Sequence, residues 1–212
     1  MERFENLADL LDLQEVDLQI DRLLHRRSSL PELEQYRAAH ERAEELAGRH
    51  RVLEGRLRAV GLDLDKAEGE LGLAEQKLEQ EERRLFAGGM SARETEHMRM
   101  EVEQTRRQVS GLEERVLEML EEKEGLEAET VGAAEALEGA RREEAALEGA
   151  ISEQWKEIDA ELARREARKA EIVGPIDPAL LDLYEQLRQT KDGVGVGRLV
   201  DGVCGGCHLA LS

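Results

Sequence analysis

The chain has 212 residues, of which 37% are charged and only 2% aromatic, and its formal net charge is −19. So few aromatic residues exclude an ordinary globular core and favour long helices. The acidic balance repels phosphate backbones, so binding to DNA or RNA would need a local basic patch. No run of about 18 apolar residues is present to cross a bilayer, and acids stand at the N-terminus where a signal peptide carries cations. We therefore predict a cytoplasmic protein.

An apolar stripe near the N-terminus predicts the first helix. Its members recur at the three- and four-residue steps of one helix face, and they are Leu10, Leu13, Val16, Ile20 and Leu23. The sequence "SSLPE" follows. Pro31 within it is expected to break or kink the helix because proline cannot donate a backbone hydrogen bond.

Two longer runs carry the heptad pattern of a coiled coil. From residue 36 to residue 85, and again from 98 to 147, the apolar positions step by alternating three and four residues, which is the seam that a left-handed coiled coil buries. When residues are paired so that their numbers sum to 183, each seam position of one run faces a seam position of the other. A shift of seven residues also fits. We interpret the polar seam residues His50, Glu81 and Lys123 as positions that set register or reach to solvent.

The link between the two runs predicts a tight turn. Gly88 and Gly89 suit a reversal of the chain, and Ser91 with Glu94 three residues later forms a capping box that starts the next helix. We place the apex at about residues 87–91. The second helix should end before Gly174 and Pro175. The domain prediction is therefore a coiled-coil hairpin over residues 1–173 and a separate C-terminal part over residues 174–212.

The C-terminal part begins with a short helix and continues into a glycine-rich tail. Asp177 and Pro178 are a cap and a first-turn proline. Alternating valines and Leu199 then predict a short β-hairpin, with Cys204 and Cys207 at its turn. A Cys-x-x-Cys of this kind fits a zinc knuckle, a redox dithiol or a metal-free loop. We favour zinc, because a redox pair usually opens a helix within a βαβ fold.

The zinc site is incomplete in this sequence, since structural zinc takes four ligands. His208 directly follows Cys207, and we interpret it as a solvent-facing residue rather than a third ligand. No phosphate-binding loop, nucleophile elbow or pair of histidines at metal spacing on a helix is present, so we do not expect an enzyme.

Four segments together resemble the bacterial C4-type zinc-ribbon proteins that have an N-terminal coiled-coil hairpin. These segments are "LLDLQEVDLQIDRLLHRRSSLPE", "LFAGGMSARETEHMRMEVE", "LLDLYEQLR" and "VCGGCHLALS". The resemblance implies an all-α fold: a long antiparallel coiled-coil hairpin with a short C-terminal helix and a partial β zinc ribbon. It also implies Zn²⁺ bound by Cys204 and Cys207 together with a second Cys-x-x-Cys. That second pair is absent, so either the sequence stops within the ribbon, which we favour, or the zinc site is lost.

The resemblance further implies an adaptor or chaperone that binds protein, with nucleic acid as a second kind of partner. A basic cluster near the base of the hairpin could meet phosphate; it consists of Arg164, Arg165, Arg168 and Lys169, with Arg22, Arg26 and Arg27 on the other arm. The simpler interpretation is that these cations pair with nearby glutamates. Only 2% of the residues are aromatic, too few for a platform that stacks on bases, so we expect a protein partner. We also expect a monomer or weak dimer, because one hairpin covers its own seam.

A transcription factor that inserts a coiled-coil finger into RNA polymerase is the alternative. Such factors place acidic residues at the fingertip. Here the tip "AGGMSARE" has few acids, and Glu94 is better explained as a helix cap. An enzyme that uses the dithiol is a third, weaker interpretation.

Overall fold

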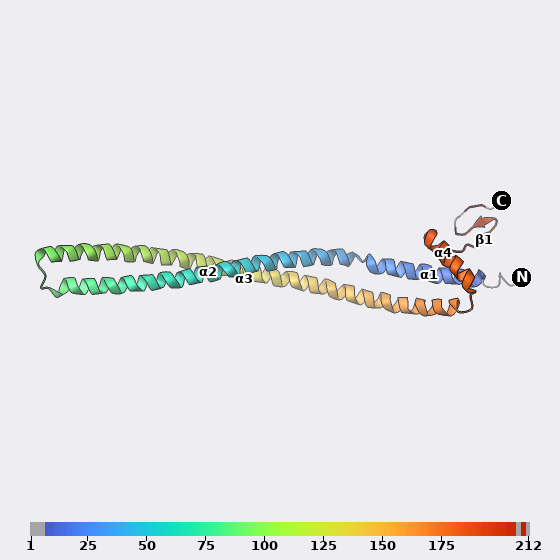
Figure 1. The fold of residues 1–212 in the computed structure, drawn as a ribbon, viewed down its shortest axis with the longest axis horizontal. Helices are drawn as coiled ribbons and strands as arrows, with labels where there is room; N and C mark the ends of the chain where they lie inside the picture. Colours follow the sequence, from blue (N-terminus) through green and yellow to red (C-terminus); the bar gives the residue numbers. More distant parts are fainter. Residues whose placement is uncertain (1–6, 207–208, 211–212) are drawn as a thin grey trace. The chain divides into compact units, whose positions relative to one another are not determined.

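The computed structural model describes residues 7–206 and 209–210 of the chain, and the described part is mostly helical (Figure 1). Four helices and two short strands follow one another: α1 (Leu7–Ser28), α2 (Pro31–Ala87), α3 (Ala92–Val173), α4 (Pro178–Thr190), β1 (Leu199–Val200) and β2 (Val203–Cys204). No helix among these residues is both long and apolar enough to cross a membrane. The predicted helical architecture is confirmed, whereas the β part amounts to two strands of two residues.

The helix ends fall at the predicted breakers. Pro31 begins α2, and α2 ends where Gly88 and Gly89 adopt φ angles of 76° and 86°, which residues with a side chain rarely adopt. The capping box is present: the Ser91 backbone N–H donates to Glu94 Oε2 over 2.8 Å, and the Glu94 N–H donates to Ser91 Oγ over 3.4 Å. The hydrogen bond from the Ser91 backbone lowers the pKa of Glu94. The apex therefore lies at residues 88–91.

The chain divides into two compact units, which we describe separately. Unit 1 comprises Met1–Ala38 and Ala145–Ser212, and unit 2 comprises Ala39–Glu144. Unit 2 is the hairpin of α2 and α3 around the apex. Unit 1 contains α1, the start of α2, the end of α3 and the C-terminal segments.

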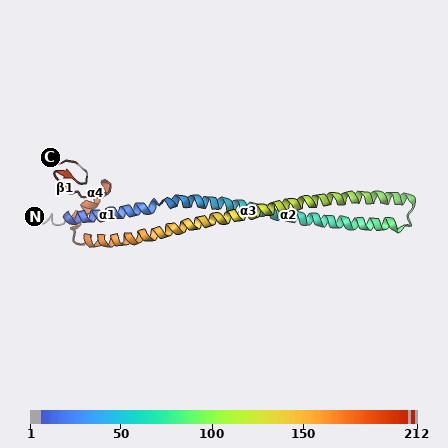
Figure 2. The same ribbon diagram turned by 180° about the vertical axis from the view of Figure 1, so that it is seen from behind.

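In unit 2 the predicted seam is the core. Every seam position from 39 to 85 and from 98 to 144 is buried or half-buried, and α2 and α3 lie side by side in opposite views (Figures 1 and 2). One core cluster contains Leu64, Ala67 and Val116, with Met119 packed against it. These contacts fit the register in which residue numbers sum to 183. A shift of seven would place Leu64 against Leu112 or Leu126 instead.

Polar seam residues of unit 2 have partners. Thr105 is 2% exposed, and its hydroxyl donates to Glu81 Oε2 over 2.7 Å. Lys77 Nζ lies 3.7 Å from the same carboxylate. One residue further along each helix, Arg106 Nε donates to Glu82 Oε1 over 3.0 Å. This polar layer interrupts the apolar seam without leaving a buried polar atom unsatisfied, as expected for positions that fix register.

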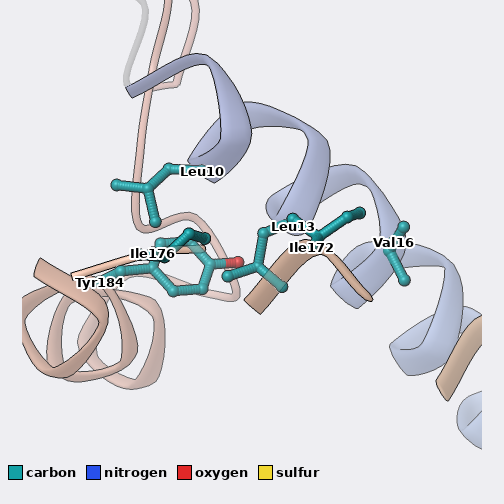
Figure 3. Packing of buried hydrophobic residues seen from close by; sticks show 6 residues of the cluster. All are labelled: Leu10, Leu13, Val16, Ile172, Ile176 and Tyr184. Carbon is teal, nitrogen blue, oxygen red and sulfur yellow. The ribbon is translucent and has the colours of Figure 1, made fainter. Parts of the chain in front are cut away.

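In unit 1 the apolar stripe of α1 packs on the end of α3 and on α4. Leu10, Leu13 and Val16 form one core cluster with Ile172, Ile176 and Tyr184 (Figure 3). A second cluster, around the joint between α1 and α2, contains Leu30, Ile151, Ile158 and Leu162.

The joint between α1 and α2 is held by the single tryptophan of the chain. Trp155 Nε1 donates to the backbone oxygen of Arg27 over 3.1 Å, and the Arg27 guanidinium lies 5.0 Å from the centre of the Trp155 ring. Arg27 Nε also lies 2.9 Å from Asp159. A carbonyl left without a helical partner at the end of α1 thus receives a hydrogen bond from α3.

The position predicted for the cysteines within the β-hairpin is wrong for Cys204. The turn of the hairpin is made by Asp201 and Gly202, whose φ angles are 49° and 77°, because a two-residue turn between twisted strands requires positive φ. Cys204 lies in β2, paired with Leu199. The chain then returns, with a bridge between Val203 and Ala210. Cys207 and His208 lie outside the described residues.

Candidate functional site

The candidate site lies in unit 1, where α4 and the tail pack against α1 and α3. Helix α4 begins at a cap predicted from the sequence: Asp177 Oδ1 accepts hydrogen bonds from the N–H groups of Ala179, over 2.9 Å, and Leu180, over 3.2 Å. Because the first N–H groups of a helix have no carbonyl four residues earlier in the helix, the carboxylate fixes where α4 begins. Nearly two turns later, Tyr184 lies against α1.

Tyr184 connects α4 to a buried carboxylate on α1. The ring lies among Leu13, Ile172 and Ile176, and its oxygen points toward α1 (Figure 3). The hydroxyl donates to Asp17 Oδ2 over 2.8 Å. Asp17 is 1% exposed, and Lys169 Nζ on α3 lies 2.8 Å from its other oxygen. A buried carboxylate is tolerated only when it is paired and hydrogen-bonded, so this group ties three helices together.

Arg188 extends the network along α4. It donates to both carboxylate oxygens of Asp21, over 2.7 and 2.6 Å, and its Nε lies 3.8 Å from Asp17. Glu185 lies 3.5 Å from Lys169 and 3.7 Å from Arg188. The anions Asp17, Asp21 and Glu185 therefore surround two cations.

The network raises the pKa of both Tyr184 and Arg188. Burial of the ring raises the pKa of Tyr184, and the hydrogen bond to Asp17 and its charge raise it further. For Arg188, partial burial opposes the charge, but the hydrogen bond to Asp21 and the charges of Asp17 and Asp21 outweigh it, so the pKa of Arg188 is raised. At this site both groups therefore act as hydrogen-bond donors.

Gln14 on α1 binds the backbone of the tail. Gln14 Oε1 accepts hydrogen bonds from the backbone N–H groups of Gly195 and Val196, each over 2.8 Å. At Gly195 a Cβ atom would lie 2.5 Å from the Tyr184 ring, so the backbone can approach the ring only because this residue is glycine. Gln14 and Tyr184 therefore hold the start of the tail in place.

Cys204 sits in a cradle of glycine backbone at the end of this tail. A Cβ added at Gly197 would lie 2.9 Å from Cys204 Sγ, and one added at Gly206 would lie 3.8 Å from it. The half-buried Cys204 also lines a cavity of about 640 Å³, together with Leu187, Thr190, Lys191, Asp192, Val194, Gly195, Val196, Gly197 and Gly206. Among residues 7–206 and 209–210, no group of three or more His, Cys, Asp or Glu side chains could hold a metal ion.

The four α3 cations of the predicted basic cluster have carboxylate partners, whereas Arg22 and Arg26 on α1 are exposed and form no ion pair within 4.0 Å among the described residues. Arg164 lies 3.4 Å from Glu161, and Arg165 also pairs with Glu161. Arg168 pairs with Glu171 over 2.9 Å. Lys169 points inward to Asp17 and Glu185, as described above. On the other arm, Arg27 pairs with Asp159.

Sequence reasoning missed the residues that position α4 and the tail. For Asp17 a signal existed: it lies on the apolar stripe of α1, four residues after Leu13 and three before Ile20, and an acid there predicts a buried partner. Gln14 and Gly195 carried no comparable signal, because their contact joins residues 181 positions apart.

Comparison with solved structures shows the same fold. A structure of CT398 from Chlamydia trachomatis matches with a TM-score of 0.76 at 19% identity, covering 98% of this chain and 87% of that one. A structure from Mycobacterium smegmatis matches with a TM-score of 0.65 at 26% identity, covering 98% and 86%. The HP0958 protein of Helicobacter pylori matches with a TM-score of 0.56 at 17% identity, covering 100% and 88%.

Sequence comparison points to the same group. Two uncharacterized proteins of Mycobacterium tuberculosis, MT2288 and Rv2229c, are each 29% identical over 204 residues, which is 95% of this chain and 82% of the relative. The family model of the CT398-like coiled coil hairpin domain matches residues 13–192. That span takes in α2, α3 and α4 with most of α1, and on this match the chain belongs to the CT398-like coiled coil hairpin family.

Proposed function

We propose that this protein is a non-enzymatic adaptor that binds another protein through the surface of its helices. The proposal rests on the apolar side chains that are exposed. The seam residues of each unit are covered within that unit, yet large apolar side chains outside the seam remain exposed; Phe86 is 80% exposed and Leu62 is 72% exposed. Contiguous exposed apolar surface is typical of protein-binding surfaces, and on α3 the neighbouring side chains of Leu117 and Leu120 are both exposed.

The charges favour a protein partner over nucleic acid. Phosphate binding needs cations that are available to the ligand. Arg164, Arg165, Arg168 and Lys169 are each engaged by carboxylates of the same unit. An RNA or DNA ligand would have to displace those carboxylates against a net charge of −19.

The apex gives little support to the alternative of a finger that enters RNA polymerase. Glu94 is the acid nearest the turn on α3, and its carboxylate caps the helix. It is therefore committed to the backbone rather than presented to a partner.

Affinity capture with the full chain tests the adaptor proposal. Proteins retained from extract of the source cells, with and without nuclease treatment, would be identified by quantitative mass spectrometry, with a variant lacking residues 88–90 as comparison. Discrete proteins retained by both chains support an adaptor. If the proteins are retained only without nuclease treatment, the adaptor proposal is overturned in favour of nucleic-acid binding. If RNA polymerase is retained by the full chain and lost by the variant without the apex, the polymerase-finger alternative is favoured.

The proposal includes a structural zinc ion held by Cys204 with Cys207. The glycine cradle around Cys204 Sγ, in which a Cβ at Gly197 would approach to 2.9 Å, suits a thiolate that must meet a metal without side-chain obstruction. When bound, zinc would cross-link the tail, because the thiolates of Cys204 and Cys207 would both bind the same ion. Structural zinc takes four ligands, of which these two cysteines would be half.

Cobalt titration tests the metal proposal. Co²⁺ bound to thiolates gives a charge-transfer absorption in the near ultraviolet, which the full chain should show and Cys204→Ser should lack. His208→Ala should keep the absorption, because we do not expect His208 to be a ligand. A full chain that gives no thiolate absorption with Co²⁺ would remove zinc from the proposal.

A further inference from the structure

The outer side of α3 in unit 2 carries an unpartnered face, which we call the acidic face. Its members step by three or four residues along the helix, so they share one side, and they are Glu113, Leu117, Glu121, Glu124, Ala128, Val131 and Glu135. All are exposed. At 1.5 Å per residue the acidic face runs for about 33 Å.

The apolar members of the acidic face do not belong to the core of the hairpin. Leu117 is 60% exposed and Val131 is 59% exposed, with Leu120 also exposed beside them. The neighbouring seam residues Val116 and Leu126 are buried against α2. The side chains of Leu117 and Val131 therefore lie outside the core and remain available to another surface.

The charge around these side chains is almost uncompensated. Residues 108–135, all of which the structure describes, contain nine acids and only two cations. Arg115 lies 3.9 Å from Glu70, and Lys123 lies 3.9 Å from Glu127. The other eight acids of this stretch form no ion pair within 4.0 Å among the described residues, including Glu121 and Glu124 on the acidic face.

Charge complementarity decides what could cover this face. Nucleic acid and anionic membranes are repelled by it. A helix with apolar residues on one side and Lys or Arg beside them would match both features, since helices recognise one another through side chains at three- and four-residue steps. We propose that the acidic face docks a positively charged amphipathic helix of a partner protein, with Leu117 and Val131 as apolar contacts.

This inference rests on the proposed adaptor function and adds the kind of partner. Attraction between the glutamates and the partner's cations would speed association and make it dependent on salt. The apolar contacts would supply most of the affinity, because exposed ion pairs contribute little.

Binding of a defined peptide tests the proposal. The probe is a fluorescent peptide of about 20 residues with leucine on one helical side and lysine on the other, long enough to span the face. Its anisotropy would be followed on titration with the full chain at about 50 and 200 mM salt. A second peptide, with every lysine replaced by glutamate, should not bind.

Matched pairs of variants locate the binding. Leu117→Gln with Val131→Gln, and separately Glu121→Gln with Glu124→Gln, should each weaken peptide binding roughly tenfold. The controls lie on α2 of the same unit: Val52→Gln with Leu73→Gln, and Glu68→Gln with Glu75→Gln. They remove the same groups from exposed positions and should change affinity less than about twofold. Circular dichroism should show unchanged helix content in all four.

Equal losses in test and control variants would overturn the acidic face as a docking site, since binding would then follow overall charge and apolarity. Binding that is insensitive to salt, or absent for the lysine peptide, would overturn it as well. None of these results bears on the adaptor function, which the capture experiment measures with the protein's own partners. Failure of capture together with specific peptide binding would instead count against the adaptor function.

Discussion

The hydroxyl of Tyr184 on α4 lies 2.8 Å from the carboxylate of Asp17 on α1, a residue 167 positions earlier in the chain. Asp17 is almost completely buried and is also paired with Lys169 on α3. Because a buried carboxylate is costly unless its oxygens have partners, this pair determines where α4 sits on unit 1 and so where the tail begins.

Removing the Tyr184 hydroxyl should loosen α4. Tyr184→Phe keeps the ring in its apolar surroundings but leaves Asp17 Oδ2 without its donor, which should lower the free energy of unfolding by about 1.5–3 kcal/mol. Urea denaturation measures the change, and amide hydrogen exchange should show faster exchange in α4. Asp182→Asn, at an exposed position on the same helix, is the control. Equal effects of the two substitutions would contradict the role assigned to Tyr184.

Glycine substitutions should have opposite effects in the two units. Gly195→Ala would bring a Cβ within 2.5 Å of the Tyr184 ring, so it should detach the tail and lower the melting temperature. Gly111→Ala meets nothing within 4 Å and should raise the stability of α3 by about 1 kcal/mol, the difference in helix propensity. Thermal melts followed by circular dichroism compare them. An unaffected Gly195→Ala protein would show that the tail does not pack on the ring.

The polar layer of the seam should show strong coupling between its members. Thr105→Val leaves the half-buried Glu81 carboxylate without its hydroxyl donor and should destabilise the hairpin by about 1–3 kcal/mol. Adding Glu81→Leu removes the unsatisfied group and should recover that loss, because apolar residues then fill the layer. A double-mutant cycle from urea unfolding gives the coupling energy. Additive effects would mean that the contact contributes nothing.

A histidine and a glutamate on facing helices of unit 2 make the hairpin sensitive to pH. His40 Nδ1 lies 2.6 Å from Glu144 Oε1. The hydrogen bond to Glu144 and its charge raise the pKa of His40 above its ordinary value, with smaller contributions from Glu44 and Glu41. The stabilisation from this pair is therefore fully present below the ordinary pKa of histidine and is lost as the pH rises through the raised value.

An NMR titration of the imidazole measures this effect. Glu144→Gln should lower the pKa of His40, whereas Glu143→Gln, which removes a carboxylate 3.8 Å from Arg42, should leave it nearly unchanged. The destabilisation by Glu144→Gln should be larger at about pH 5.5 than at about pH 8.5. The opposite order would mean that the pair is formed by neutral histidine.

Most of the helical architecture could be predicted because its signals are local. The heptads place α2 and α3, proline begins α2 and α4, and glycines 88 and 89 with the Ser91 cap mark the apex. The tail was harder to predict. Its valines suggested a hairpin, but the position of the turn depends on which residues adopt positive φ, and Asp201 was not an obvious choice beside several glycines.

The sequence by itself determined where the helices begin and end and which of their sides meet, because seam spacing, caps and breakers act over a few residues. Only the tertiary structure decided that Asp17, Lys169, Tyr184 and Arg188 share one buried network and that Gln14 holds the tail. Those contacts join segments more than 100 residues apart in the chain, and a hydrogen bond depends on distance and direction that no local pattern specifies.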